Sequence, residues 1–123
     1  MIHDYKVPEL IAERLPEIKS DLGWLQTQGD VVYSVQVLAS YSKRKLIEKD
    51  FKLVEKCFQV AEKLFLRGDK PVKKAIVNYF VISLPAMLLA CNKKGESSKL
   101  RECITPTLYA LYLKQIQIQT ANQ

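Results

Sequence analysis

Apolar residues recur at intervals of three and four along most of the chain, the spacing of an amphipathic α-helix. The pattern is clearest over residues 48–67. Its stripe consists of Phe51, Val54, Phe58, Ala61 and Phe65, widened by Leu53, Cys57, Val60 and Leu64. A second stripe follows Asp30, which we expect to cap a helix over residues 30–46. The β-branched start of that segment also fits a strand, but no second candidate strand is present to pair with it. The pattern therefore predicts two long helices in the middle of the chain.

The N-terminal apolar stripe is interrupted by a proline. Pro8 suits the first turn of a helix, but Pro16 cannot lie inside a continuous one because it lacks an amide hydrogen and its ring clashes with the preceding turn. We expect two helical pieces, or one sharply kinked helix, before Gly29. The stripe that they share consists of Leu10, Ile11, Leu15, Ile18, Leu22 and Leu25.

The segment "AIVNYFVISLPAMLLAC", residues 75–91, is apolar on all sides. It is shorter than the ~20 residues that span a bilayer, and Asn78, Ser83 and Pro85 interrupt it, so we expect the buried centre of a globular domain rather than a membrane helix. Pro85 predicts a kink, or the start of a new helix, after a helix over residues 70–84.

The tripeptide Arg67-Gly68-Asp69 matches a motif that adhesion receptors bind, and two interpretations compete for it. Gly68 directly follows the helix over residues 48–67, so we expect it to end that helix in a left-handed conformation. Asp69 precedes Lys70-Pro71, which is typical of an N-cap followed by a first-turn proline. The sequence therefore favours a boundary between two helices over a receptor ligand.

The last apolar stripe begins at Thr105-Pro106 and predicts a C-terminal helix that frays at "QIQIQT". With 123 residues and 48% apolar content, the chain has enough material for one core. We therefore expect an all-α protein with a single helical domain over residues 1–123, arranged as an irregular bundle or short antiparallel array of five to seven helices.

Charge is distributed unevenly along the chain. Residues 1–42 hold three basic and six acidic side chains, whereas residues 43–123 hold the other sixteen basic and seven acidic ones, and the total is +6. The basic clusters form a candidate interaction face: Lys43, Arg44, Lys45, Lys49, Lys52, Lys56, Lys70, Lys73 and Lys74. Such a face favours an acidic protein partner. Two alternatives stay open, a solvated surface and weakly specific nucleic-acid binding through residues 43–74.

The residues that most catalytic sites use are scarce. His3 is the only histidine, which argues against Ser-His or Cys-His catalysis, and no Gly-rich phosphate loop or zinc-ligand spacing is present. Cys57, Cys91 and Cys103 are widely separated, which is typical of buried thiols rather than of a disulfide framework. Together with the lack of a secretion signal at the N-terminus, this pattern predicts a cytoplasmic protein that is not an enzyme and takes no cofactor or metal.

One candidate pocket comes from the apolar segment. Asn78 is the polar residue that stands out there, and a buried amide that is satisfied by a neighbouring helix end explains it best. The alternative is a small-ligand pocket formed by Asn78 and Tyr79.

Three segments, "PELIAERLPEIKSDL", "EKCFQVAEKLFLRGD" and "KPVKKAIVNYFVISL", resemble a group of small all-helical uncharacterised bacterial domains. The resemblance covers residues 7 to about 90. Some such domains resemble immunity proteins, which neutralise a toxin by binding it, so the resemblance implies a non-enzymatic, protein-binding role. This chain departs from the group at Leu84-Pro85, where an acidic residue often follows, and in its basic middle. A basic inhibitor suits an acidic toxin surface better than the basic cleft of a nuclease.

Overall fold

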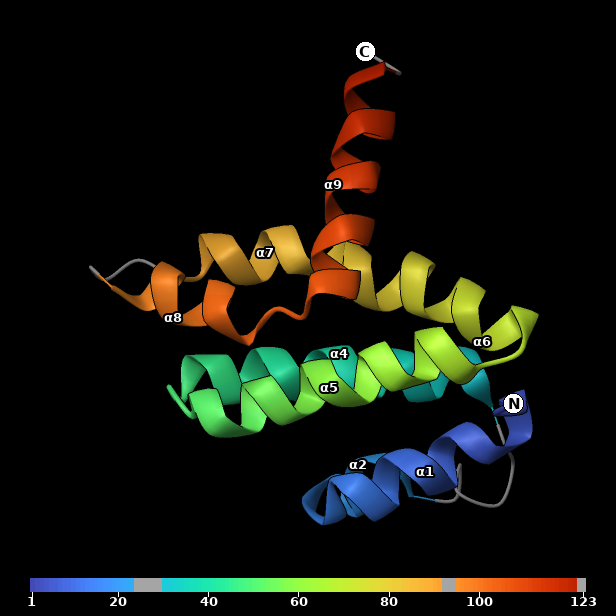
Figure 1. The fold of residues 1–123 in the computed structure, drawn as a ribbon. Coiled ribbons are helices and arrows are strands. Elements are labelled where there is room, and N and C mark those ends of the chain that lie inside the picture. Colours follow the sequence, from blue (N-terminus) through green and yellow to red (C-terminus); the bar gives the residue numbers. More distant parts are fainter. Residues whose placement is uncertain (24–29, 92–94, 122–123) are drawn as a thin grey trace.

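Helices make up nearly all of the computed structural model, which describes residues 1–23, 30–91 and 95–121 (Figure 1). The α-helices are α1 (Val7–Arg14), α2 (Lys19–Leu22), α4 (Val31–Ile47), α5 (Phe51–Arg67), α6 (Lys70–Ala75), α7 (Leu84–Leu89), α8 (Glu96–Cys103) and α9 (Pro106–Ala121). Shorter elements are the 3-10 turns η1 (Asp4–Lys6), η2 (Pro16–Ile18) and η4 (Val81–Ser83), and the π-helical turn η3 (Ile76–Phe80). No strand occurs in the described ranges, so the all-α prediction is confirmed.

The helices form three layers and an upright arm (Figure 1). The pair α1 and α2 lies below the long antiparallel pair α4 and α5, and the run from α6 to α7 lies above that pair together with α8. The last helix, α9, stands away from the layers. With Lys70–Leu89 counted as one interrupted helix, the described part holds 7 helices, within the predicted five to seven.

One apolar cluster joins every layer. Buried side chains from α1, α4, α5, the α6–α7 run, α8 and α9 belong to it. At its centre, the rings of Phe58 and Phe80 meet edge to face, with centroids 5.7 Å apart. This geometry is the favoured one for aromatic pairs and fixes α5 against η3.

Most predicted helix boundaries are confirmed by their capping bonds. The carboxylate of Asp30 accepts a hydrogen bond from the amide of Tyr33 at 3.0 Å, and the hydroxyl of Thr105 accepts one from Leu108 at 3.3 Å. The predicted start at residue 48 is wrong by three residues. Lys49 has a left-handed backbone, and the carboxylate of Asp50 caps α5 by accepting from the amide of Leu53 at 3.2 Å.

Gly68 ends α5 as expected, but not in the expected conformation. Its backbone is extended, with φ −75° and ψ 157°, so the prediction of a left-handed residue is wrong. Gly68 is needed for space instead, because a Cβ atom there would lie 2.6 Å from Cβ of Val72 and even closer to the carbonyl oxygen of Leu64. Ile2 forms a parallel β-bridge with this buried glycine, which fits a helix boundary rather than a displayed ligand loop.

The run from α6 to α7 is irregular where the sequence predicts a kink. Pro85 lies in the first turn of α7, and a proline there cannot donate to the carbonyl four residues before it. The helix is π-helical over Ile76–Phe80 and 3-10 helical over Val81–Ser83, immediately before the proline. By length and composition, Lys70–Leu89 is the one helix of the described part that is apolar enough to cross a membrane, a test that the core helix of a soluble protein also passes. Here it covers the α4–α5 pair (Figure 1).

Candidate interaction surface

Folding divides the predicted basic face into groups, and one group is neutralised internally. Nη2 of Arg44 lies 3.0 Å from Oδ2 of Asp21. Nζ of Lys45, whose side chain is only 15% exposed, lies 3.2 Å from Glu48 and 3.8 Å from Glu17. Because Asp21 and Glu17 belong to the acidic first third of the chain, the separation of charge along the sequence is partly cancelled in space.

Tyr41 lies within this ion-paired group. Its hydroxyl donates a 3.2 Å hydrogen bond to Glu17, and the cations of Arg44 and Lys45 each lie 5.3 Å from the centre of its ring. Burial, together with the charge of Glu17 and this hydrogen bond, raises the pKa of Tyr41 to about 12. Lys49 is also paired, 3.4 Å from Glu96. The charges of Arg44, Lys45 and Lys49 are therefore paired with carboxylates of the same chain.

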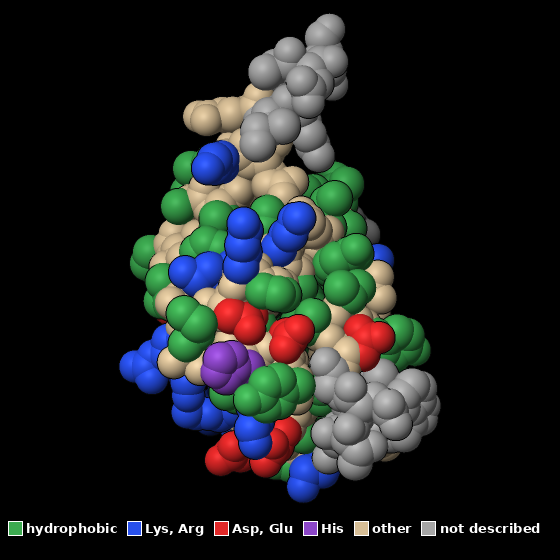
Figure 2. All heavy atoms as spheres, turned by 90° about the vertical axis from the view of Figure 1, so that its right-hand side faces the viewer, with side chains coloured by type: hydrophobic (Ala, Val, Ile, Leu, Met, Phe, Trp, Pro, Cys, Tyr) green, Lys and Arg blue, Asp and Glu red, His purple; other side chains and the backbone are tan. Residues whose placement is uncertain are grey.

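Four other predicted lysines lie in two separate places. Lys43 is exposed on α4, whereas Lys70, Lys73 and Lys74 are exposed on α6, which begins beyond the far end of α5. Nζ of Lys73 lies 6.0 Å from the centre of the Phe65 ring. In Figure 2, which shows the side where α6 begins, basic and acidic side chains are interspersed with apolar ones. The nine predicted residues thus do not form one continuous face.

Two of the predicted lysines belong to a different cluster, which we call the basic strip: Arg14, Lys52, Lys56, Lys63 and Arg67. Four of its members follow one side of α5, because positions 52, 56, 63 and 67 are separated by whole helical turns. Arg14, at the end of α1, joins them across a small groove of about 80 Å³ that Lys56, Gln59, Val60 and Lys63 also line. A wider groove of about 400 Å³ continues from Arg14 to Leu66 and Arg67.

The basic strip has no ion-pair partner among the residues that the structure describes. Among the described residues, no carboxylate lies within ion-pair distance of any of its five members. Two acidic residues border it, since Glu62 lines the wider groove and Glu55 accepts a 3.4 Å hydrogen bond from Gln59. The strip therefore presents free positive charge at a defined spacing, with negative charge along one edge.

Sequence reasoning missed three members of the strip. Arg14 lies in the acidic third of the chain, and only packing of α1 against α5 places it beside Lys56 and Lys63. Lys63 and Arg67 continue the spacing of Lys52 and Lys56 along the helix, a signal that was readable from the sequence.

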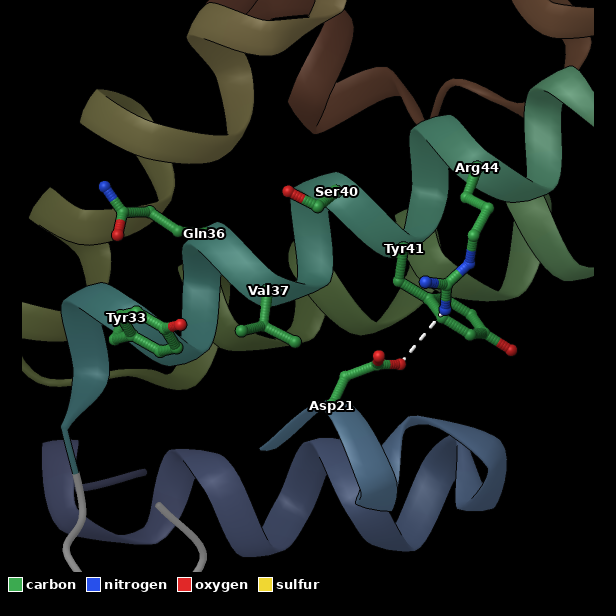
Figure 3. Close-up of a pocket in the computed structure, with 7 residues that line it drawn as sticks. All are labelled: Asp21, Tyr33, Gln36, Val37, Ser40, Tyr41 and Arg44. Carbon is green, nitrogen blue, oxygen red and sulfur yellow. Dashed lines mark hydrogen bonds and ion pairs between the residues drawn. The ribbon is translucent and has the colours of Figure 1, made fainter. Parts of the chain in front are cut away.

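A second surface feature is a groove of about 380 Å³ between α2 and α4 (Figure 3). Its lining residues are Asp21, Tyr33, Gln36, Val37, Ser40, Tyr41 and Arg44. In Figure 3 the guanidinium of Arg44 points to the carboxylate of Asp21, so the two charges in the groove satisfy each other. The groove offers a partner little free charge and is a weaker candidate than the basic strip.

The expectation of a buried amide at Asn78 is wrong. Asn78 is exposed on η3, whereas Tyr79 is half-buried and packs against the core. Neither residue lines the grooves described above. The reason is helical phase, because the neighbours Ile76 and Phe80 occupy the core side of the turn and rotate position 78 toward solvent. A small-ligand pocket at these two residues stays a prediction, because they line none of the grooves described here.

The thiols and the acidic groups offer little chemistry. Burial raises the pKa of Cys57 and of Cys103 to about 11, so both remain protonated at neutral pH. All three cysteines are free, and no three His, Cys, Asp or Glu side chains of the described part lie together as metal ligands would.

No curated protein and no solved structure matches this chain. A family model does match residues 8–120, which is most of the sequence, and it carries the description Domain of unknown function (DUF7674). From this match over helices α1 to α9, the chain belongs to the DUF7674 family.

Proposed function

We propose that the chain is a non-enzymatic protein-binding module that holds an acidic segment of its partner against the basic strip. The observation that carries this proposal is the row of five cations on α5 and α1, none of which pairs with a carboxylate of residues 1–23, 30–91 or 95–121. Unpaired charge at a regular spacing attracts an oppositely charged surface and fixes the register of binding.

The dimensions of the strip suit a short acidic segment. The four members on α5 extend over residues 52–67, or about 22 Å at 1.5 Å per residue. An extended peptide covers that length with about seven residues. The wider groove adds the apolar side chain of Leu66, which is 56% exposed beside Arg67. A segment that turns its carboxylates toward the strip and ends in an apolar side chain beside Leu66 would contact both features.

Nucleic-acid binding is the main alternative, and the border of the strip disfavours it. Glu55 and Glu62 lie along one edge, where they would repel a phosphate backbone that approaches α5. A protein partner can place a basic or neutral residue opposite those two carboxylates, whereas a nucleic acid cannot.

The resemblance to immunity proteins gives the proposal a specific form, in which the partner is a toxin with an acidic surface. The three free cysteines fit a reducing cytoplasm, where such a complex would form. Family membership alone supplies no partner, since the family is described as one of unknown function.

The test compares binding of a fluorescent polyglutamate peptide and of single- and double-stranded DNA of matched net charge. The variant Lys56→Glu/Lys63→Glu changes the strip, and Lys70→Glu/Lys74→Glu changes net charge equally on α6, outside the strip. We expect the strip variant to weaken peptide binding by about tenfold or more, which is about 1.4 kcal/mol, and the α6 variant to have a smaller effect. Equal losses in both variants, or tighter binding of DNA than of peptide, would overturn the proposal.

A further inference from the structure

The C-terminal helix carries an apolar stripe that stays partly exposed in the part of the chain that the structure describes. Tyr109, Leu113 and Ile116 are 47%, 42% and 39% exposed, and the half-buried Tyr112 lies between them. These four positions, which we call the α9 stripe, follow the spacing i, i+3, i+4 and i+7 of a helix that packs against another helix. Figure 1 shows α9 rising away from the layers.

The stripe is held firmly in place. Leu108 is fully buried at the base of α9, and farther along the helix Nε2 of Gln115 donates a 3.1 Å hydrogen bond to the carbonyl oxygen of Val77. The rings of Tyr109 and Tyr112 lie 6.3 Å apart and support each other. The exposed stripe is therefore a fixed surface beside the packed side of α9.

The α9 stripe differs from the rest of the protein in having almost no charged residues near it in the sequence. Charged residues make up 26% of the chain, yet Lys114 is the only one in residues 104–123. At 100° per residue, Lys114 lies on the side of α9 opposite the stripe. An uncharged apolar surface matches another uncharged surface, and it is a poor match for the acidic segment proposed at the basic strip.

We propose that the α9 stripe pairs with the α9 stripe of a second copy, the two helices running antiparallel about a two-fold axis. Such an interface requires that when residue i contacts residue j, residue j also contacts residue i. The stripe meets this requirement. Centred between positions 112 and 113, antiparallel pairing places Tyr109 opposite Ile116 and Tyr112 opposite Leu113, so every tyrosine ring packs on an aliphatic side chain.

The upright position of α9 also lessens the repulsion between two molecules that each carry a charge of +6. Contact through the arms keeps the charged layers apart, and repulsion fades beyond about 8 Å at physiological salt. The arm is about 24 Å long, from its 16 residues. Because the stripe residues are already half covered, the buried area falls below the ~800 Å² per partner of a standard interface, so the dimer is weak and reversible, with a Kd in the micromolar range.

The test is the weight-average mass by sedimentation equilibrium from about 5 μM to about 500 μM, a range that brackets a micromolar Kd. We expect the mass to rise from 14.1 kDa toward twice that value. The variant Tyr109→Glu/Leu113→Glu should stay monomeric throughout. The matched control Ala110→Glu/Gln117→Glu adds two carboxylates at exposed positions of α9 outside the stripe and should dimerise as the parent does.

Several outcomes would overturn the dimer. They are a parent that stays at monomer mass, a stripe variant that still dimerises, or equal loss of association in both variants. Sedimentation with phosphatidylcholine and phosphatidylglycerol vesicles tests whether the stripe binds membranes instead. If the parent stays monomeric and binds vesicles, and the stripe variant does not bind them, the α9 stripe is a membrane-binding surface. The strip variant Lys56→Glu/Lys63→Glu should dimerise normally, so failure here is distinguishable from failure of the proposed function.

Discussion

The guanidinium of Arg44 lies 3.0 Å from the carboxylate of Asp21, and this ion pair joins α4 to α2. In the sequence the two residues belong to oppositely charged parts of the chain, 23 positions apart. Their contact shows that the acidic N-terminal third serves partly to neutralise the densest basic run. The charge that remains available to a partner is therefore displaced along α5 to the basic strip.

The stability of this ion pair can be measured with a double-mutant cycle of Asp21→Asn and Arg44→Gln. Both side chains are partly exposed, at 33% and 52%, so solvent screens their attraction. We expect a coupling free energy of about 0.2–1 kcal/mol from urea unfolding, decreasing as salt is added. Lys43→Gln serves as the control and should leave stability nearly unchanged, since no described carboxylate pairs with Lys43. A coupling of zero at low salt would contradict the pair.

Gly68→Ala should be strongly destabilising, because the new methyl group would collide with the carbonyl oxygen of Leu64 and with Val72. Relief requires α5 and α6 to move apart at the corner where Ile2 also binds. We expect a loss of about 2–4 kcal/mol in the free energy of unfolding. Gly95→Ala is the comparison, since a Cβ atom there meets nothing within 4 Å and the substitution costs only the backbone strain of φ 91°. If the free energy of unfolding falls no more at Gly68 than at Gly95, the junction between α5 and α6 has room for the added methyl group.

Asp69→Ala should cost more than Asp30→Ala, although both residues cap a helix. Asp30 accepts one side-chain hydrogen bond from a backbone amide, that of Tyr33. Asp69 accepts two, from Val72 at 3.2 Å and from Asp4 at 3.2 Å, and so also holds the N-terminal segment. Loss of a cap costs about 1 kcal/mol, and the second amide adds a similar amount. Thermal or urea unfolding of the two variants gives the comparison, and equal losses would show that the contact with Asp4 contributes nothing.

Stability should fall in alkaline solution. The pKa of Cys57 and of Cys103 rises from 9.0 to about 11, and that of Tyr41 from 10.0 to about 12, chiefly through burial. The folded state keeps these protons at pH values where the unfolded state has lost them, so the free energy of unfolding decreases as pH rises from about 9 to about 12. Urea unfolding at a series of pH values measures the slope.

The variant Tyr41→Phe distinguishes the contribution of the Tyr41 phenol to this pH dependence from the contribution of the two cysteine thiols. The variant loses the hydrogen bond to Glu17 at every pH, but it should show a shallower decline than the parent above about pH 10. Identical slopes above pH 10 would contradict a raised pKa at Tyr41.

Local signals in the sequence specified most of the fold. A carboxylate or hydroxyl before an apolar stripe marked the helix starts at Asp30, Asp69 and Thr105, because these side chains satisfy amides that the helix leaves free. Pro16 separated the first two helical pieces for an equally local reason, the missing amide hydrogen.

Two of the wrong predictions, those at Gly68 and Asn78, concern positions that tertiary packing decides, whereas the start of α5 is set locally by the cap at Asp50. Gly68 is extended rather than left-handed and forms a bridge with Ile2, a contact 66 positions away in the sequence. Asn78 turns outward because the core takes Ile76 and Phe80.

The basic strip was predicted only in part: the helical spacing already indicated Lys63 and Arg67, but Arg14 reaches the strip only through the packing of α1 on α5. No single-sequence pattern records that contact.

The bridge between Ile2 and Gly68 attaches the N-terminal segment to the junction between α5 and α6. The amide of Asp4 binds a carboxylate 65 positions ahead, so this closure restricts a long loop and carries a large entropic cost. This contact stabilises the protein only once α4, α5 and α6 have packed together, because the residues that bind the N-terminal segment lie where α5 meets α6. We therefore expect residues 1–6 to dock late during folding and to release early, and hydrogen exchange at the amide of Ile2, which donates to the carbonyl oxygen of Arg67, would measure that opening.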